Sequence, residues 1–457
     1  MNVWVPSVTG DEKPLYQAIV NALKADIREG SVAHGTRLTP QRDLAEQLNI
    51  SVGTVSRAYA EAERLGIVTA GVGRGTFVNV QTQANSAPAA ASARPWNFAL
   101  NAPPQTGEDS EIARCLAEIG AENRLASLLD YLPHAGHPDH TAALTPVVAS
   151  VGLALGTDDL LLTPGAQHGL YIALRLAAEQ GGPIATEAFT FSGLTAIAKL
   201  GRHSLAGVAV DDDGLLPEAL SETLNRSGAK VLYATPTLQT PTGTVMSQQR
   251  RESVAAVLQS RGTWLIEDDA YAFLPDKPVA PISALIPDQS FYITSFAKSL
   301  APGLRLGALV PPKALRDRAA MAMRATGWMA APVMAEVVTR MVRDGSFDAQ
   351  VSAKRIVAKR RTGIARDLLD GLMPFDTSTA GYHVWVQPPD TSQLLSILNA
   401  ASAHGITLAP PLVAKTPDPI TPGLRLCLGG FATDEDLSCA LGAVERVIRS
   451  ATELSYV

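Results

Sequence analysis

The chain has 457 residues, of which 46% are hydrophobic and 18% charged, so it can fill the cores of two or three domains and is not intrinsically disordered as a whole. Its net charge of −6 excludes a uniformly basic nucleic-acid coat but not a local DNA-binding face. The three cysteines are Cys115, Cys427 and Cys439, whose spacing supports neither a disulfide framework nor a metal site.

The N-terminal residues 1–17 do not combine a basic segment with an apolar one, so we expect no signal peptide. The longest apolar stretch, 319–338, contains Arg324, Pro332 and Glu336. We therefore interpret it as a buried helix of a globular domain and not as a membrane span. These features predict a soluble, cytoplasmic protein.

The first segment, residues 10–78, has the pattern of a small domain of helices followed by a hairpin. Gly30 and Gly66 follow helical patterns and are typical stops, whereas Ser51 is a good N-cap. The spacing of apolar residues predicts helices over 16–27, about 40–48 and 51–65, and then two extended runs within 67–78.

Residues 37–65 have the order helix, tight turn, helix that is typical of a DNA-reading motif. Small hydroxyl groups and arginine near the start of the second helix can reach base edges and phosphates in a major groove. Two amphipathic helices that only pack as a core would show the same spacing, and residues 1–80 hold eight basic and eight acidic side chains, so charge does not decide. The residues that we expect to contact DNA are Arg42, Thr54, Ser56, Arg57 and, at the tip of the hairpin, Arg74.

Residues 79–95 are rich in Ala, Ser, Pro and Gln and predict a flexible linker. Residues 96–455 then alternate short apolar runs with helical stretches such as 248–261, which predicts a large, mainly parallel α/β/α domain. From about 335 to 455, long helices followed by a mixture of strands and helices predict a smaller α+β lobe. The apolar runs are 184–186, 231–235, 264–267, 291–294 and 304–310.

Lys298 follows one of these predicted strands, in the run S-F-A-K-S-L-A-P-G-L-R at 295–305. A lysine at a strand end in apolar surroundings can have a lowered pKa and form a Schiff base with a carbonyl cofactor. Arg305 can bind a phosphate as a planar fork. An isolated Ser-x-x-Lys is more often an ordinary surface lysine, so the prediction depends on the combination.

Two upstream segments complete the combination. Asp268 and Tyr271 follow another predicted strand, where a buried carboxylate can keep a pyridine nitrogen protonated and a phenol can hydrogen-bond a ring hydroxyl. Residues 163–170 open a helix, and backbone amides at a helix start point toward an anion. An ordinary helix start has the same local pattern; the amides concerned are those of Gly165, Ala166 and Gln167.

The run L-T-P-x-R-D-L-A…I-S-V-G-T-V-S-R-A-Y…G-x-G-R-G-T-F-V, within 38–78, resembles the GntR-type winged helix-turn-helix. This resemblance implies double-stranded operator DNA as a partner. Many members of that family have arginine where this chain has Val52, so a base preference does not carry over.

Residues 95–455 resemble the fold-type I transferases of the aspartate aminotransferase kind, which implies pyridoxal 5′-phosphate as cofactor. Lys298 matches the Schiff-base lysine, Asp268 the partner of the pyridinium nitrogen and Tyr271 the phenol on the ring oxygen. The positions that match the phosphate site are Ser295, Arg305 and the turn Gly165, Ala166 and Gln167.

Four further positions are implied by the same resemblance. Phe191 matches the aromatic side chain that stacks on the cofactor ring, although a lone aromatic is more often part of a core. Arg425 matches the arginine that grips a substrate carboxylate, and Tyr131 the tyrosine that reaches the phosphate of the partner subunit, which implies a homodimer. Thr240 stands where the family has the asparagine of Asn-Pro-Thr-Gly, and its hydroxyl is shorter than an amide.

The two resemblances together indicate the MocR group of bacterial regulators. The expected function is a DNA-binding transcriptional regulator whose aminotransferase-like domain binds pyridoxal phosphate and senses an amine or amino acid. One alternative is an active aminotransferase with an auxiliary DNA-binding arm. Another is a sensor of pyridoxal phosphate with no second ligand, which the presence of Arg425 disfavours.

Overall fold

The computed structural model describes residues 4–6, 14–28, 32, 36–64, 67–71, 75–78, 96–372, 375–376, 380–409, 412–414, 416, 420 and 423–453. The chain divides into two compact units, Met1–Ser92 and Ala93–Val457. The expected linker 79–95 and Arg74 lie outside the described residues. In the part that is described, no helix is both long and apolar enough to cross a membrane.

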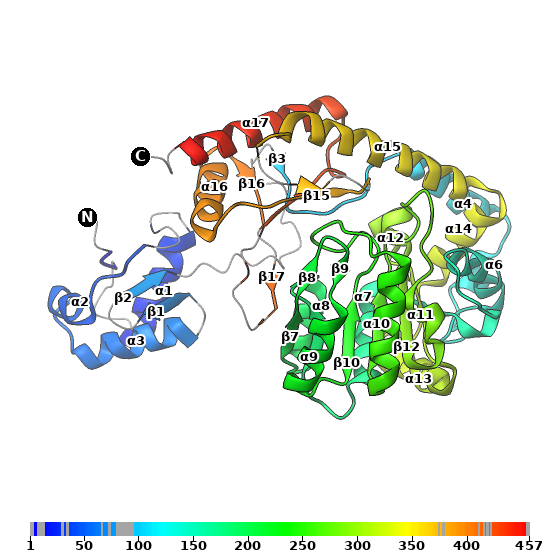
Figure 1. Ribbon diagram of the computed structural model, residues 1–457, viewed down its shortest axis with the longest axis horizontal. Helices are drawn as coiled ribbons and strands as arrows, with labels where there is room; N and C mark the ends of the chain where they lie inside the picture. Colours follow the sequence, from blue (N-terminus) through cyan, green and yellow to red (C-terminus); the bar gives the residue numbers. More distant parts are fainter. Residues whose placement is uncertain are drawn as a thin grey trace. The chain divides into compact units, whose positions relative to one another are not determined.

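The first unit has three helices and a hairpin (blue in Figure 1): α1 (Leu15–Arg28), α2 (Gln41–Gln47), α3 (Val52–Arg64), β1 (Val68–Gly71) and β2 (Gly75–Val78). Apolar residues at helical spacing, such as Ile19 and Leu23 of α1 and Val55 and Tyr59 of α3, enter one core. The hairpin is antiparallel, with Val68 opposite Val78. The predicted elements of this unit are therefore present.

The second unit is built on a sheet with the strand order β4-β13-β12-β11-β10-β5-β7. All neighbouring pairs are parallel except those of β13, which runs antiparallel to β12 and to β4. The prediction of a mainly parallel sheet is confirmed. The strands are β4 (Leu161–Thr163), β5 (Ile184–Glu187), β7 (Leu205–Val208), β10 (Val231–Ala234), β11 (Trp264–Asp268), β12 (Ser290–Ser295) and β13 (Gly307–Val310).

Helices cover both faces of this sheet (Figure 1). Because successive side chains of a strand point to opposite faces, Leu161 and Ile266 pack under α7 (Ala166–Ala177), α8 (Ser192–Leu200) and α13 (Arg316–Thr326). Their neighbours Leu162 and Leu265 face the opposite side. That side is covered by α4 (Glu108–Ala121), α5 (Leu125–Leu128), α6 (Pro138–Ala149), α9 (Pro217–Ser227), α10 (Gln248–Arg261), α11 (Ile282–Leu285) and α14 (Pro332–Arg343).

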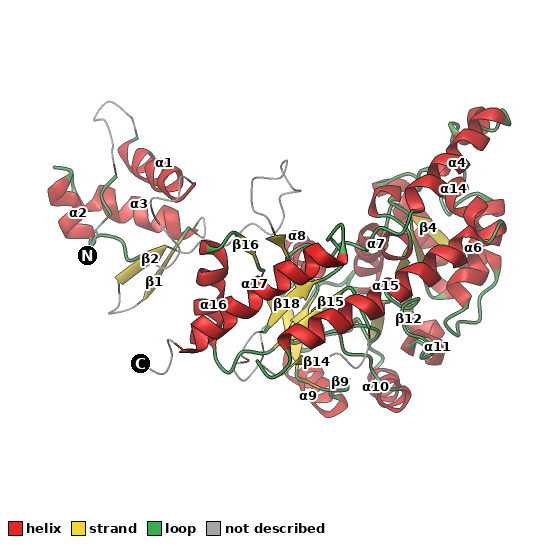
Figure 2. Cartoon of the chain, turned by 90° about the horizontal axis from the view of Figure 1, so that it is seen from above, coloured by secondary structure: helices red, strands yellow, loops and turns green. Residues whose placement is uncertain are grey.

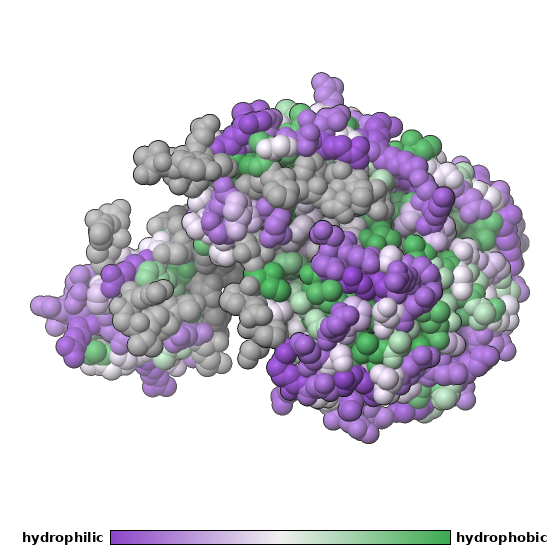
Figure 3. Space-filling view, viewed as in Figure 1, coloured by the Kyte–Doolittle hydropathy of each residue, from purple (hydrophilic) through white to green (hydrophobic). Residues whose placement is uncertain are grey.

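The outer surface of these helices is polar, as amphipathic surface helices require. In α9, Leu220 and Leu224 are buried, whereas Glu218 and Glu222 are exposed. Figure 3 shows this outward face in purple. Short elements connect the layers: β6 (Phe189–Thr190), the hairpin β8 (Val210–Asp211) and β9 (Gly214–Leu215), and α12 (Phe296–Ser299).

A smaller lobe has its own hydrophobic cluster, which includes Phe98, Val384 and Leu426. The long helix α15 (Ser346–Leu369) joins the lobes, because its first half packs in the large lobe and its second half in the small one (Figures 1 and 2). The other elements are β3 (Trp96–Asn97), β14 (Phe375–Asp376), β15 (His383–Val386), α16 (Thr391–Ala403), β16 (Ile406–Thr407), β17 (Leu412–Val413), β18 (Leu424–Cys427) and α17 (Asp434–Glu453).

The apolar stretch 319–338 is not one helix, so that expectation was wrong. Helix α13 ends before Gly327, and α14 begins at Pro332. Proline has no backbone N–H and its ring clashes with the preceding turn, so it is tolerated in the first turn of a helix but not in the interior. Between the two helices, Trp328 has a φ of 66°.

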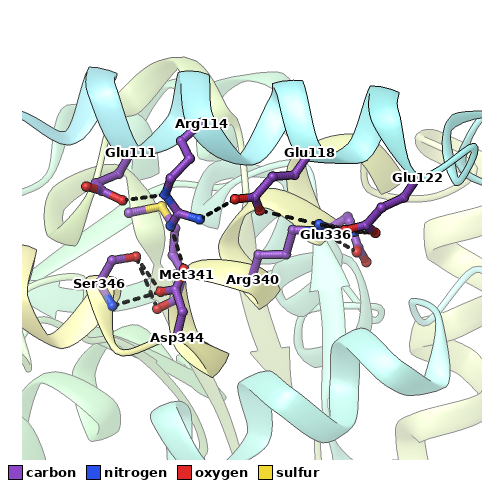
Figure 4. A network of polar contacts seen from close by, with 9 residues as sticks. All are labelled: Glu111, Arg114, Glu118, Glu122, Glu336, Arg340, Met341, Asp344 and Ser346. Atoms are coloured by element: carbon purple, nitrogen blue, oxygen red, sulfur yellow. Dashed lines mark hydrogen bonds and ion pairs between the residues drawn. The ribbon is translucent and has the colours of Figure 1, made fainter.

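A polar network joins α4 to α14 (Figure 4). Arg114 of α4 pairs with Glu118 and with Asp344, which follows α14, and Arg340 of α14 pairs with Glu122 of α4. Arg340 also pairs with Glu336, whose side chain is only 1% exposed. Glu336 accepts a hydrogen bond at 3.0 Å from Nε2 of His140, which is equally buried and lies on α6. The network therefore extends from the surface to a buried contact between two helices.

Candidate functional site

Residues that follow β4, β10, β11 and β12, and one that precedes β13, meet at one edge of the sheet. The carboxyl ends of parallel strands lie together there, and β13 begins at this edge because it is antiparallel. A cavity of about 240 Å³ opens at this edge. It is lined by Asn101, Ala166, Gln167, Phe191, Tyr233, Thr235, Thr237, Leu238, Thr240, Asp268, Ala270, Tyr271, Ser295, Ala297, Lys298, Pro302, Arg305 and Arg425.

Lys298 lies in the short helix α12, directly after the end of β12. Ser295 caps this helix: its Oγ accepts a hydrogen bond from the backbone N–H of Ala297 at 3.1 Å. Burial lowers the pKa of Lys298 to about 8, and the positive charge of Arg425 acts in the same direction. An appreciable fraction of the amine is therefore neutral near pH 7 to 8 and can act as a nucleophile.

Asp268 ends β11 and is buried. Its Oδ2 accepts a hydrogen bond at 3.0 Å from the hydroxyl of Tyr233, on the neighbouring strand β10. Burial raises the pKa of Asp268 to about 6, although the Tyr233 hydroxyl opposes the increase. The group is thus still mainly a carboxylate at neutral pH and can stabilise a protonated ring nitrogen.

The start of α7 and Arg305 form a cradle for an anion. Gly165 is the N-cap of α7, with a φ of 81°, and is followed by Ala166 and Gln167. A Cβ atom at Gly165 would lie 2.7 Å from Nη2 of Arg305, so the guanidinium lies directly against the glycine. Free N–H groups at a helix start and a neighbouring guanidinium are suited to a phosphate.

The phenol of Tyr271 lines the same cavity as Lys298 and this cradle. Its Oη accepts a hydrogen bond at 2.7 Å from Nδ2 of Asn101. The same Nδ2 lies 3.1 Å from Nδ1 of His383, and Lys298 Nζ donates to the backbone oxygen of Asn101. The Oδ1 atom of Asn101 is buried and has no hydrogen-bond partner among the described residues.

Three further predicted residues line the cavity. Arg425, on β18 of the small lobe, donates to the backbone oxygen of Ala99 at 2.8 Å and brings a positive charge near Lys298. Phe191 caps α8 and is half-buried, and Thr240 is buried. Tyr131 does not line the cavity of its own chain: it is 78% exposed, and its ring lies 5.2 Å from that of Trp328.

In the first unit, several residues expected to contact DNA already contact other side chains of the protein. The Thr54 hydroxyl lies 2.8 Å from that of Ser51, and Ser56 donates to Oε1 of Gln41 at 2.6 Å, which ties α3 to α2. The guanidinium of Arg57 is exposed but lies 4.3 Å from the ring centre of Tyr16. Arg42 is exposed on α2. At the start of α3, the apolar side chain of Val52 is 45% exposed.

The side chains that line the cavity match the chemical groups of pyridoxal phosphate. It offers an amine of lowered pKa, a buried carboxylate, a phenol, and a cradle that a Cβ at Gly165 would fill. The unpartnered Oδ1 of Asn101 is a buried acceptor of the kind that a ligand satisfies.

Residues 93–444 match the family model for aminotransferases of class I and II. The chain belongs to this family. Residues 15–78 match the model for bacterial regulatory proteins of the gntR family. The predicted architecture, a GntR-type helix-turn-helix followed by a fold-type I aminotransferase domain, is therefore confirmed. The aminotransferase class I and II family is dependent on pyridoxal phosphate.

Relatives of this aminotransferase-family chain are regulators that match it over most of their length. The HTH-type transcriptional regulator YdeF of Bacillus subtilis (strain 168) is 27% identical over 84% of this chain and 84% of its own. The probable rhizopine catabolism regulatory protein MocR of Rhizobium meliloti is 24% identical over 87% and 86%. Kynurenine aminotransferase of Pyrococcus horikoshii shares the fold, with a TM-score of 0.72 and 22% identity over 79% of this chain and 92% of that structure.

Sequence reasoning missed several polar residues in or next to the cavity, among them Asn101, Tyr233 and His383. Tyr233 could have been predicted, since it lies near the end of a predicted strand, where side chains of parallel strands converge. Asn101 and His383 could not have been predicted from a local pattern, because each belongs to a segment that is far in sequence from Lys298.

Proposed function

We propose that this protein is a DNA-binding transcriptional regulator that binds pyridoxal phosphate at Lys298 and senses an amine or amino acid. The observation that carries the proposal is one cavity that unites Lys298, Asp268, Arg305 and Arg425 in a chain with a GntR-type helix-turn-helix. The relatives that match most of this chain are named as regulatory proteins, which supports the proposal.

Each side chain has a distinct task in this proposal. Pyridoxal phosphate, when bound, supplies a carbonyl carbon that amines attack and a ring that withdraws electrons. The neutral amine of Lys298 holds this carbon, Asp268 keeps the ring nitrogen protonated, and Arg305 with the start of α7 binds the phosphate. Arg425 binds the carboxylate of the effector as a fork, and the effector amine then competes with Lys298.

The effector must bind the two states of the regulator with different affinity if it is to change DNA binding. Coupling between such sites is typically about 1–3 kcal/mol, which corresponds to about 5- to 150-fold in DNA affinity. On the DNA side, we assign Arg42 and Arg57 to phosphates and the start of α3 to base edges. Arg57→Ala also removes the contact with Tyr16, so Arg42→Ala is the cleaner test.

A second function is favoured by one observation: Lys298, Asp268 and Arg425 all line the cavity, as turnover of an amino acid would require. In that function Lys298 also moves the proton of the substrate α-carbon. The protein would then be an active aminotransferase with an auxiliary DNA-binding arm.

A titration of the purified holoprotein with a panel of amino acids separates the two functions. If the protein is a regulator, the amino acid should change the visible spectrum of the holoprotein without formation of keto acid. It should also change the affinity of the protein for a DNA duplex selected from a random pool. Sustained formation of keto acid identifies the enzyme. If Lys298→Ala still attaches the cofactor after reduction with borohydride, the site assignment is wrong.

A further inference from the structure

We propose that Asn101, held by His383, is a positioning residue that makes the hydroxyl of Tyr271 a hydrogen-bond donor toward the cofactor ring. This inference rests on the proposed binding of pyridoxal phosphate. It assigns a role to two residues that the family pattern did not indicate, at a site where Thr240 replaces the asparagine of that pattern.

The direction of each hydrogen bond follows from His383. Its Nε2 lies 3.4 Å from the backbone oxygen of Gln239, and a carbonyl oxygen only accepts, so Nε2 carries the hydrogen. Burial lowers the pKa of His383 to about 3, and the charges of Arg425 and Lys298 act in the same direction, so the ring is neutral. Its Nδ1 is therefore an acceptor.

An acceptor at Nδ1 determines the orientation of the Asn101 amide. The side-chain nitrogen, not the oxygen, must face His383, and the distance is 3.1 Å. The second hydrogen of the same nitrogen is donated to Tyr271 Oη at 2.7 Å. Both N–H groups of Asn101 are thereby used, which leaves its Oδ1 buried and without a partner in the part of the chain that the structure describes.

Tyr271 Oη thus receives a hydrogen bond and keeps its own hydrogen to donate. Among the described residues, no acceptor takes that hydrogen, and Tyr271 lines the cavity. A hydroxyl that donates to an anionic ring oxygen stabilises its charge. Without Asn101 the Tyr271 hydroxyl can rotate, so its hydrogen is no longer directed toward the cofactor ring. The titratable groups around Tyr271 are Asp268, Lys298, Tyr382, His383, Arg425 and Cys427.

The test is the pH at which the visible absorption of the full-length protein changes after loading with pyridoxal phosphate. Asn101→Leu and His383→Phe should each move this midpoint upward by about one pH unit. The reason is that a ring oxygen without a protein donor holds the nearby proton on the Lys298 nitrogen more tightly. His404→Phe, an exposed histidine at the end of α16, is the matched control and should not move it.

A Tyr271→Phe background shows whether Asn101 acts through the phenol. There, Asn101→Leu should cause no further shift, because the group that it directs is absent. An equal shift in both backgrounds, or no shift in the single variants, overturns the proposal. Borohydride trapping on wild-type Lys298 is measured first: if it fails, the proposed function fails, whereas trapping with unshifted variants removes only the role of Asn101. Thermal midpoints identify a variant that is misfolded, in which case Asn101→Ala replaces it.

Discussion

At the scale of single residues, the site depends on close contacts that allow little substitution. Gly165 illustrates this best, because its φ of 81° and ψ of 164° lie in a region that is almost exclusive to glycine. The adjacent guanidinium of Arg305 leaves no room for a side chain. Backbone conformation and packing therefore both require glycine at the start of α7.

We predict that Gly165→Ala weakens binding of pyridoxal phosphate by at least about tenfold, since it displaces Arg305 and removes a charge-assisted hydrogen bond. Equilibrium dialysis of the full chain measures the affinity. Gly303→Ala is the matched control, because a Cβ at Gly303 meets no atom within 4 Å. Equal affinity of the two variants would contradict the phosphate cradle.

A second residue-scale prediction concerns pH. Because the pKa of Lys298 is lowered to about 8, the rate at which apoprotein captures pyridoxal phosphate should rise with pH, with its midpoint near pH 8, and then level off. Arg425→Gln removes a positive charge that lowers this pKa, so the midpoint should move upward. Stopped-flow absorbance measures both profiles, and a midpoint unchanged by Arg425→Gln would refute the electrostatic argument.

At the scale of elements, α6 and α14 meet through the buried pair His140 and Glu336. Burial acts to raise the pKa of Glu336, but hydrogen bonds from His140 and Arg340 outweigh it and hold that pKa below its usual range. A carboxyl with a lowered folded-state pKa adds stability above its unfolded-state pKa and loses it as pH falls. The contact is therefore sensitive to acid.

Glu336→Gln should reduce the free energy of unfolding by about 1–3 kcal/mol at pH 7, because the charge-assisted hydrogen bonds are lost. The difference from wild type should shrink as pH falls below about 4.5, where Glu336 of the unfolded chain begins to be protonated, and should vanish once the folded-state carboxyl is protonated as well. Urea-induced unfolding at several pH values measures it. Glu111→Gln, in the exposed part of the same network, should cost less than about 0.5 kcal/mol. A pH-independent difference would count against this assignment.

At the scale of the whole molecule, the exposed Tyr131 raises the question of assembly. Its side chain is 78% exposed and does not line the cavity of its own chain. We infer that it completes the phosphate site of a second copy. Such a site requires at least a dimer, and two-fold symmetry would suit an operator with two half-sites.

Mixed dimers test this inference. A chain with Tyr131→Phe paired with a chain with Lys298→Ala should retain one cofactor site of wild-type affinity per dimer. The reason is that a shared site takes Lys298 from the first chain and Tyr131 from the second. Cofactor retention of the isolated heterodimer measures it. Retention no better than in the Tyr131→Phe homodimer would show that the tyrosine acts within its own chain.

Much of this protein was predictable because the signals are local. Helix α10 was predicted over 248–261, its bounds in the structure, since its N-cap, its apolar spacing and the following glycine lie in one continuous stretch. The run at 295–305 likewise predicted Lys298 after a strand and Arg305 as a phosphate ligand, and both residues line the cavity. The prediction of one helix over 319–338 was wrong, because Pro332 begins a second helix instead of lying inside the first.

Only the tertiary structure decided which groups meet around these motifs. Tyr233 bonds to Asp268 across two strands, and Asn101 reaches Tyr271 and His383 from distant parts of the chain. It also showed that Ser56, expected at the DNA surface, donates to Gln41. The physical reason is that secondary structure follows from contacts within a few residues, whereas a hydrogen bond requires two atoms about 3 Å apart in space, which local patterns do not encode.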